Sequence, residues 1–71
     1  MIKTQAQARS EFAAYFLDLQ ADAHRDGASV NKASEWEFFI TNEIEEGRVG
    51  QDARLWKCPR SLKALVANAG A

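Results

Sequence analysis

Residues 34–46 read SEWEFFITNEIEE, and their apolar positions recur at the spacing that predicts an α-helix. A helix turns roughly 100° per residue, which places one apolar stripe along this segment: Ala33, Trp36, Ile40 and Ile44. Phe38 projects about 160° away from Ile40, onto a polar face of the same helix. A large aromatic side chain on a polar face either covers a second packing surface or contacts a partner.

A longer helix is predicted before this segment, from the N-cap residue Thr4 to about His24. Its core-facing side chains follow helical spacing: Ala8, Phe12, Tyr15, Phe16, Leu19 and Ala23. Gly27 is the expected stop, because glycine adopts the left-handed conformation that ends many helices. The connection that follows contains Ser29 and Asn31, either of which is a suitable cap for the second helix.

In the C-terminal third, the sequence pattern predicts two more helical segments after the second helix ends at Gly47. Residues 51–57 form a short helix that Pro59 terminates, because proline lacks an amide hydrogen and restricts the residue before it. The last helix starts near Arg60, is stopped by Gly70, and presents one apolar stripe: Leu62, Leu65, Val66 and Ala69.

No segment alternates between apolar and polar residues for long enough to predict a strand. We therefore expect an all-α fold, a small three- to four-helix bundle in which residues 1–71 make one helical domain. A core in so short a chain seldom supplies more than about 3–5 kcal/mol, so close helix packing, self-association or a partner adds to stability. The expected core contains Phe12, Phe16, Leu19, Trp36, Ile40, Ile44, Trp56, Leu62, Leu65 and Val66.

The cysteine and histidine content argues against a cofactor. Cys58 is the only cysteine, and neither it nor His24 belongs to a metal-ligand spacing, so no metal or other cofactor is expected. The first residues lack the apolar core of a signal peptide, and no run approaches the roughly 20 apolar residues that cross a bilayer. Together with one unpaired cysteine, this predicts a cytoplasmic protein without a membrane partner.

An enzyme is not expected, because acid–base catalysis needs titratable groups gathered in a cleft, and short helices offer little concavity. His24, the only histidine, is expected to be an exposed or capping residue at a helix end. Cys58 lies between Lys57 and Pro59, a positive setting that favours a lowered thiol pKa. A structural, partly buried cysteine is the simpler interpretation.

Charge is unevenly distributed along the chain, although the net charge is only −1. Residues 1–47 carry four basic and nine acidic side chains, a net of −5, whereas residues 48–71 carry five basic and one acidic side chain, a net of +4. Such asymmetry indicates either a charged partner or the matching of helix dipoles. At the negative end of the second helix, where each carboxylate is unfavourable by roughly 0.3–1 kcal/mol, lie Glu43, Glu45 and Glu46. Either a basic residue such as Arg48 neutralises them, or they belong to a functional surface.

The interpretation we favour is protein binding through the second helix. The candidate contacts are Glu35, Phe38, Phe39, Asn42, Glu45 and Glu46. An aromatic anchor inside a charged rim is typical of an interface hot spot, and an acidic rim indicates a partner with a basic surface, such as a nucleic-acid-handling protein. We expect an adaptor or inhibitor of the kind found among phage and plasmid accessory proteins. If the last helix folds back over Phe38, that ring belongs to the core instead, and self-association through it also stays open.

The alternative is a nucleic-acid-binding helical domain that uses the basic C-terminal third. Its candidate contacts lie within sixteen residues: Arg48, Arg54, Lys57, Arg60 and Lys63. Trp56 lies among them, and an aromatic ring can stack on a base. Against this interpretation, Trp56 continues an apolar series with Val49 and Ala53, and the pI of about 5.7 is below the values typical of nucleic-acid binders.

Overall fold

The computed structural model describes residues 2–69 and consists of helices and the connections between them. Helix α1 spans Gln5–Arg25, α2 spans Lys32–Glu45, the 3-10 helix η1 spans Gln51–Leu55, and α3 spans Leu62–Ala69. The described residues contain no strand, so the all-α prediction is confirmed. The side chain of Val66, a predicted core residue, and Gly70, the predicted stop of the last helix, lie outside the described part of the chain.

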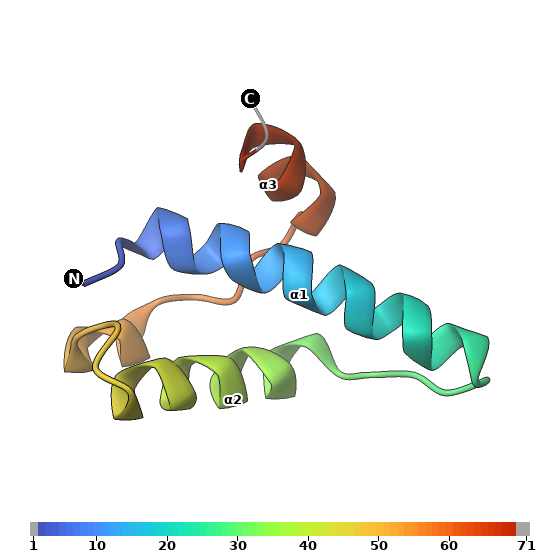
Figure 1. Ribbon diagram of the computed structural model, residues 1–71, viewed down its shortest axis with the longest axis horizontal. Coiled ribbons are helices and arrows are strands. Elements are labelled where there is room, and N and C mark those ends of the chain that lie inside the picture. Colours follow the sequence, from blue (N-terminus) through green and yellow to red (C-terminus); the bar gives the residue numbers. More distant parts are fainter. Residues whose placement is uncertain (1, 70–71) are drawn as a thin grey trace.

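Helix α1 lies in the middle of the molecule, with α2 along one side and α3 on the opposite side (Figure 1). Helices α1 and α2 run in opposite directions because a short connection joins them, and η1 packs against α2. The chain between η1 and α3 crosses α1, so that α3 packs mainly on α1. A closed three- to four-helix bundle, in which the last helix also covers α2, is therefore not confirmed.

Both ends of α1 follow from local hydrogen bonding. The Thr4 side chain accepts a hydrogen bond from the Gln7 amide at 3.1 Å, and the Gln7 side chain accepts one from the Thr4 amide at 2.9 Å, which makes a capping box. At the C-terminal end, Gly27 adopts a φ of 74°, and the next amide, that of Ala28, donates to the Ala23 carbonyl at 2.8 Å. The predicted cap and stop of this helix are confirmed.

Helix α2 is closed at both ends in the same manner. The Asn31 side chain, rather than that of Ser29, is the N-cap and accepts a hydrogen bond from the Ser34 amide at 2.9 Å. Gly47 ends the helix at a φ of 74°, and the Arg48 amide donates to the Glu43 carbonyl at 2.9 Å. This turn brings Arg48 back alongside the last turn of α2.

The segment after α2 is less helical than its sequence pattern predicts. The predicted helix over residues 51–57 is a 3-10 helix of five residues that ends at Leu55, and Trp56 is already extended at φ −72°, ψ 137°. Its N-cap, Gly50, supplies no side-chain hydrogen bond, and a nucleus this short gains little from propagation. Pro59 is fully buried, and α3 begins only at Leu62, two residues later than predicted.

The core draws side chains from all four elements and is centred on aromatic rings. The ring of Phe12 lies 5.1 Å from that of Trp36, 5.6 Å from that of Phe16 and 5.5 Å from that of Phe39, measured between centroids. The buried apolar residues are Ala8, Phe12, Ala13, Phe16, Trp36, Ile40, Val49, Ala53 and Leu62. Four predicted core residues are only partly buried, namely Leu19, Ile44, Trp56 and Leu65. Two stripe residues are exposed, namely Tyr15 and Ala33.

One acidic side chain is buried within this core. Glu43 is 2% exposed, and its carboxylate accepts hydrogen bonds from Lys3 Nζ at 2.6 Å and from Arg48 Nε. Burial by itself raises the pKa of Glu43, but the hydrogen bonds from Lys3 and Arg48 outweigh it and hold that pKa below its ordinary value. The Lys3 amide also donates to the Arg48 carbonyl at 2.8 Å. Arg48 therefore neutralises the first of the three glutamates, and Glu45 and Glu46 stay exposed.

Candidate protein-interaction surface

The position of α3 decides the environment of Phe38. Because α3 packs on α1, on the side away from α2, it does not cover the polar face of α2 (Figure 1). Phe38 is 76% exposed, an unusual state for so large an apolar side chain. Phe38 is thus a surface residue and not part of the core.

Phe38 borders a hollow of about 230 Å³ between α1 and α2, here called the aromatic hollow, whose other lining residues are Tyr15, Phe39 and Asn42. Phe39 is half-buried, and its ring stacks on that of Tyr15 with 6.4 Å between centroids and 24° between planes. Phe39 also packs against the buried ring of Phe12, which ties the hollow to the core. The Phe39 wall of the hollow is therefore ordered by packing against the core, whereas the Phe38 ring is largely exposed to solvent.

Tyr15 is a member of this surface that the helical spacing assigns to the core. It is 45% exposed, and its hydroxyl donates a hydrogen bond to Glu35 Oε1 at 2.9 Å across the two helices. This hydrogen bond is the main reason that the pKa of Tyr15 is raised. The three-residue spacing of Tyr15 from Phe12 suggests a shared face, and only the placement of α2 shows that the tyrosine lies at its rim.

Acidic residues next to the aromatic hollow, on the same face of α2, form what we call the acidic rim. On α2, Glu35 is half-buried and Asn42 is exposed, one turn before and after Phe38 and Phe39. Glu45 and Glu46 continue the rim beyond Asn42 as exposed side chains at the end of the helix. The structure thus brings Glu35, Phe38, Phe39 and Asn42 together, with the last two glutamates at the margin.

The rim extends onto α1 through Glu11 and Asp18, which helical spacing alone does not assign to it. Glu11 and Asp18 lie one helical turn before and after Tyr15, and both are exposed. Glu11 accepts a hydrogen bond from Lys3 at 2.7 Å, which offsets part of its charge. Carboxylates from two helices therefore flank the same group of rings, and this favours a ligand that is both cationic and apolar.

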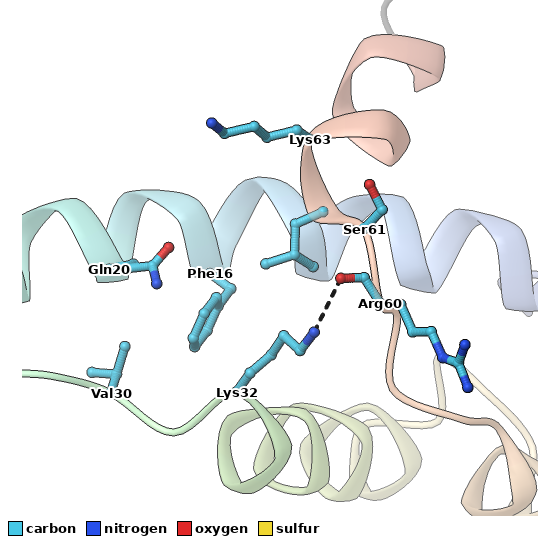
Figure 2. Close-up of a pocket in the computed structure, with 8 residues that line it drawn as sticks. Phe16, Gln20, Val30, Lys32, Arg60, Ser61 and Lys63 are labelled. Atoms are coloured by element: carbon cyan, nitrogen blue, oxygen red, sulfur yellow. Dashed lines mark hydrogen bonds between the residues drawn. The ribbon is translucent and has the colours of Figure 1, made fainter.

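The five basic residues of the C-terminal third are not brought together. Arg48 is paired with Glu43, and Arg54 lines a separate hollow of about 350 Å³ beside Trp36 and Trp56. Lys57 is exposed. The remaining two, Arg60 and Lys63, border a third hollow near the start of α3 (Figure 2). Trp56 is half-buried, and its carbonyl accepts a hydrogen bond from the Trp36 indole at 3.3 Å, so it is a packing residue.

Cys58 differs from the reactive thiol that its basic neighbours suggest. It is half-buried, and its Sγ lies 4.0 Å from the Lys32 carbonyl oxygen. Burial raises the pKa of the Cys58 thiol, and the positive charges of Lys32 and Arg9 only partly oppose that rise. The basic neighbours therefore do not lower the pKa of this thiol, and the structural interpretation of this cysteine agrees with its partial burial.

Within the described residues, two other kinds of feature are absent: a metal site and a membrane-spanning helix. Across residues 2–69, no three His, Cys, Asp or Glu side chains are placed to share a metal ion. In the same range, no helix has the length and apolar character needed to cross a membrane. No family model, no curated protein and no solved structure matches the chain.

Proposed function

We propose that this chain is a small non-enzymatic protein-interaction module that binds another protein through the aromatic hollow and its acidic rim. The observation that carries the proposal is the 76% exposure of Phe38 beside a hollow lined by Tyr15, Phe39 and Asn42. The module uses its all-helical fold as a scaffold and acts in the cytoplasm as an adaptor or inhibitor, in the manner of phage and plasmid accessory proteins.

The energetic argument rests on how unevenly binding energy is distributed in interfaces. Burying a Phe side chain contributes about 1.5–3 kcal/mol, so Phe38 alone is a candidate hot spot. Phe39 is already ordered by packing on Phe12, so little side-chain entropy is lost when a partner covers it. A rigid wall next to one free ring is a suitable receptor for an inserted side chain.

The charge of the rim selects the partner. Glu35, Glu45 and Glu46 attract a basic surface and repel an acidic one, which affects association rate and specificity more than affinity. Arginine is the side chain best suited to the hollow, because its planar guanidinium stacks on aromatic faces and pairs with carboxylates. Proteins that handle nucleic acids carry such arginine-rich surfaces, and they are the class of partner we propose.

The test compares two exposed apolar residues on different faces. Phe38→Ala should leave the free energy of unfolding within about 1 kcal/mol of wild type, because it is a surface substitution, and should abolish capture of a partner from the native host. Leu55→Ala is the matched control, since Leu55 is 84% exposed on η1 and does not line the aromatic hollow. The captured protein is then purified, and its affinity is measured at low and high salt, where an acidic rim predicts weaker binding at high salt.

Two results would contradict this proposal. The first is a partner that binds Phe38→Ala as tightly as it binds wild type. The second is a free energy of unfolding of Phe38→Ala that lies well below that of wild type, which would place Phe38 in the core. Sedimentation of the isolated chain separates binding of another protein from self-association, because a dimer formed through Phe38 dissociates in the Phe38→Ala variant.

A further inference from the structure

A hollow of about 450 Å³ lies beside α1, between the connection into α2 and the start of α3 (Figure 2). Phe16 and other apolar side chains form its floor, and Gln20 and Ser61 are its neutral polar residues. Every charged side chain in its lining is positive, namely Lys32, Arg60 and Lys63. We call it the cationic hollow.

Lys32 is the cation that the fold holds in place. It is half-buried, and its Nζ donates a hydrogen bond to the Arg60 carbonyl at 3.2 Å, as drawn in Figure 2. An ammonium group has three N–H donors, so two are left for another acceptor. The ion pairs among the described residues use Lys3, Arg25 and Arg48, and Lys32 forms none of them.

A second cation near Lys32 is also without a counter-ion in those pairs. Arg9 is half-buried, and its Nε is buried without a hydrogen-bond partner. The charges of Arg9 and Lys32 both act on the thiol of Cys58, which places them in one neighbourhood. Half-buried positive charges with no acidic partner are costly, whereas the buried Glu43, near the other end of α2, has two cationic partners.

The positions of two lysines at helix N-termini add to this excess of unpaired positive charge. Lys32 is the first residue of α2, and Lys63 is the second residue of α3. The N-terminal end of a helix carries partial positive charge, so cations are unfavourable there and anions are favourable. Cations gathered at two such ends, around one hollow, indicate a site that an anion completes.

We propose that the cationic hollow binds the phosphate group of a ligand. The two free N–H donors of Lys32 and the hydroxyl of Ser61 contact the phosphate oxygens, and Lys63 closes over them. In Figure 2 the Lys63 side chain extends along α1 and the Arg60 guanidinium points away from Phe16. Both residues are exposed and have long side chains that reorient at little cost, whereas Lys32 is positioned in advance.

The test titrates the full chain with sodium pyrophosphate and follows backbone amide shifts by NMR. Lys32→Gln and Lys63→Gln should each raise the pyrophosphate dissociation constant, by about tenfold for Lys32, since charge-assisted hydrogen bonds are lost. Lys57→Gln is the matched control, because it removes the same charge from an exposed basic residue that does not line the hollow. It should change the dissociation constant by less than about twofold, as expected for an exposed charge that is screened by solvent and does not line the hollow.

Thermal melting shows that the variants are folded and supplies a second readout. Removing a cation from a helix N-terminus should leave the melting temperature of free Lys32→Gln close to that of wild type. Pyrophosphate should raise the melting temperature of wild type and of Lys57→Gln, but not that of Lys32→Gln. A purely structural Lys32 would show the reverse, a lower melting temperature without ligand.

A single-stranded DNA oligonucleotide identifies the source of the phosphate. Binding that is tighter than that of pyrophosphate and is lost in Lys32→Gln assigns the hollow to a nucleic-acid backbone. Lys32-dependent binding of pyrophosphate alone assigns it to a small phosphorylated molecule. Binding of neither probe, or equal losses in Lys32→Gln and Lys57→Gln, would overturn the proposal.

Discussion

Glu43 is the residue at which the sequence is least informative and the structure most specific. By sequence it is one of three glutamates at the unfavourable end of a helix, together with Glu45 and Glu46. In the fold it alone is buried, because Lys3, forty positions earlier, and Arg48, folded back by the turn at Gly47, both reach it. Helical spacing describes neighbours within a helix, and it contains no information on a partner so distant in the chain.

The pairing of Glu43 predicts acid-sensitive stability. The pKa of Glu43 in the folded state lies below its ordinary value of 4.5. As the pH falls, the carboxylate is therefore protonated in the unfolded chain before it is protonated in the folded chain. The stabilisation is present above about pH 4.5 and is lost as the pH falls below that value. Glu43→Gln should cost about 2 kcal/mol at pH 7, since two charge-assisted hydrogen bonds are weakened, and should lose less stability on acidification than wild type does. The measurement is urea unfolding between pH 7 and pH 3.

The control for Glu43→Gln is Glu45→Gln, which removes the same charge from an exposed position two residues away. It should shift the free energy of unfolding by no more than about 0.5 kcal/mol at pH 7. If the two variants have equal stability and equal pH dependence, the cluster of Lys3, Glu43 and Arg48 does not stabilise the fold.

At the scale of the elements, the helix ends are what the sequence predicts best. Thr4, Gly27 and Gly47 act as predicted, because caps and glycine stops are local and need no knowledge of the remaining fold. The segment over residues 51–57 is predicted less well, since 3-10 and α-helices share similar spacings over a single turn. The stripe on α3 shows that this helix has an apolar face, but not that the face packs on α1 instead of α2.

Gly47 is the element boundary on which the Glu43 cluster depends. A Cβ at Gly47 meets no atom within 4 Å, so the cost of Gly47→Ala comes from its φ of 74° alone, about 1–2 kcal/mol. Gly47→Asn should cost less, because asparagine tolerates this conformation better than alanine. Urea unfolding of the two variants checks this order, and an alanine variant as stable as wild type would contradict a left-handed conformation at residue 47.

At the scale of the whole molecule, the acidic part of the sequence (residues 1–47) and the basic part (residues 48–71) do not form separate acidic and basic surfaces. Arg48, from the basic part, pairs with Glu43 in the acidic part. Lys32, from the acidic part, lines the same hollow as Arg60 and Lys63. The candidate residues on α2 were predictable because they share one helix face. Tyr15 and Lys32 were not, because each enters its surface through the packing of a second element.

The two hollows share no lining residue and should therefore act independently. Phe38 belongs to the surface shared by α1 and α2, whereas Lys32 faces the start of α3. Substitutions at sites that share no partner are usually additive within about 0.3–0.5 kcal/mol. Phe38→Ala should thus leave pyrophosphate binding unchanged, and Lys32→Gln should leave partner binding unchanged. In the double variant, the binding free energy for each ligand should fall by the sum of the changes measured in the two single variants. A coupling larger than this, measured by calorimetric titration of the four proteins, would mean that α1 transmits a change between the hollows or that one ligand spans both.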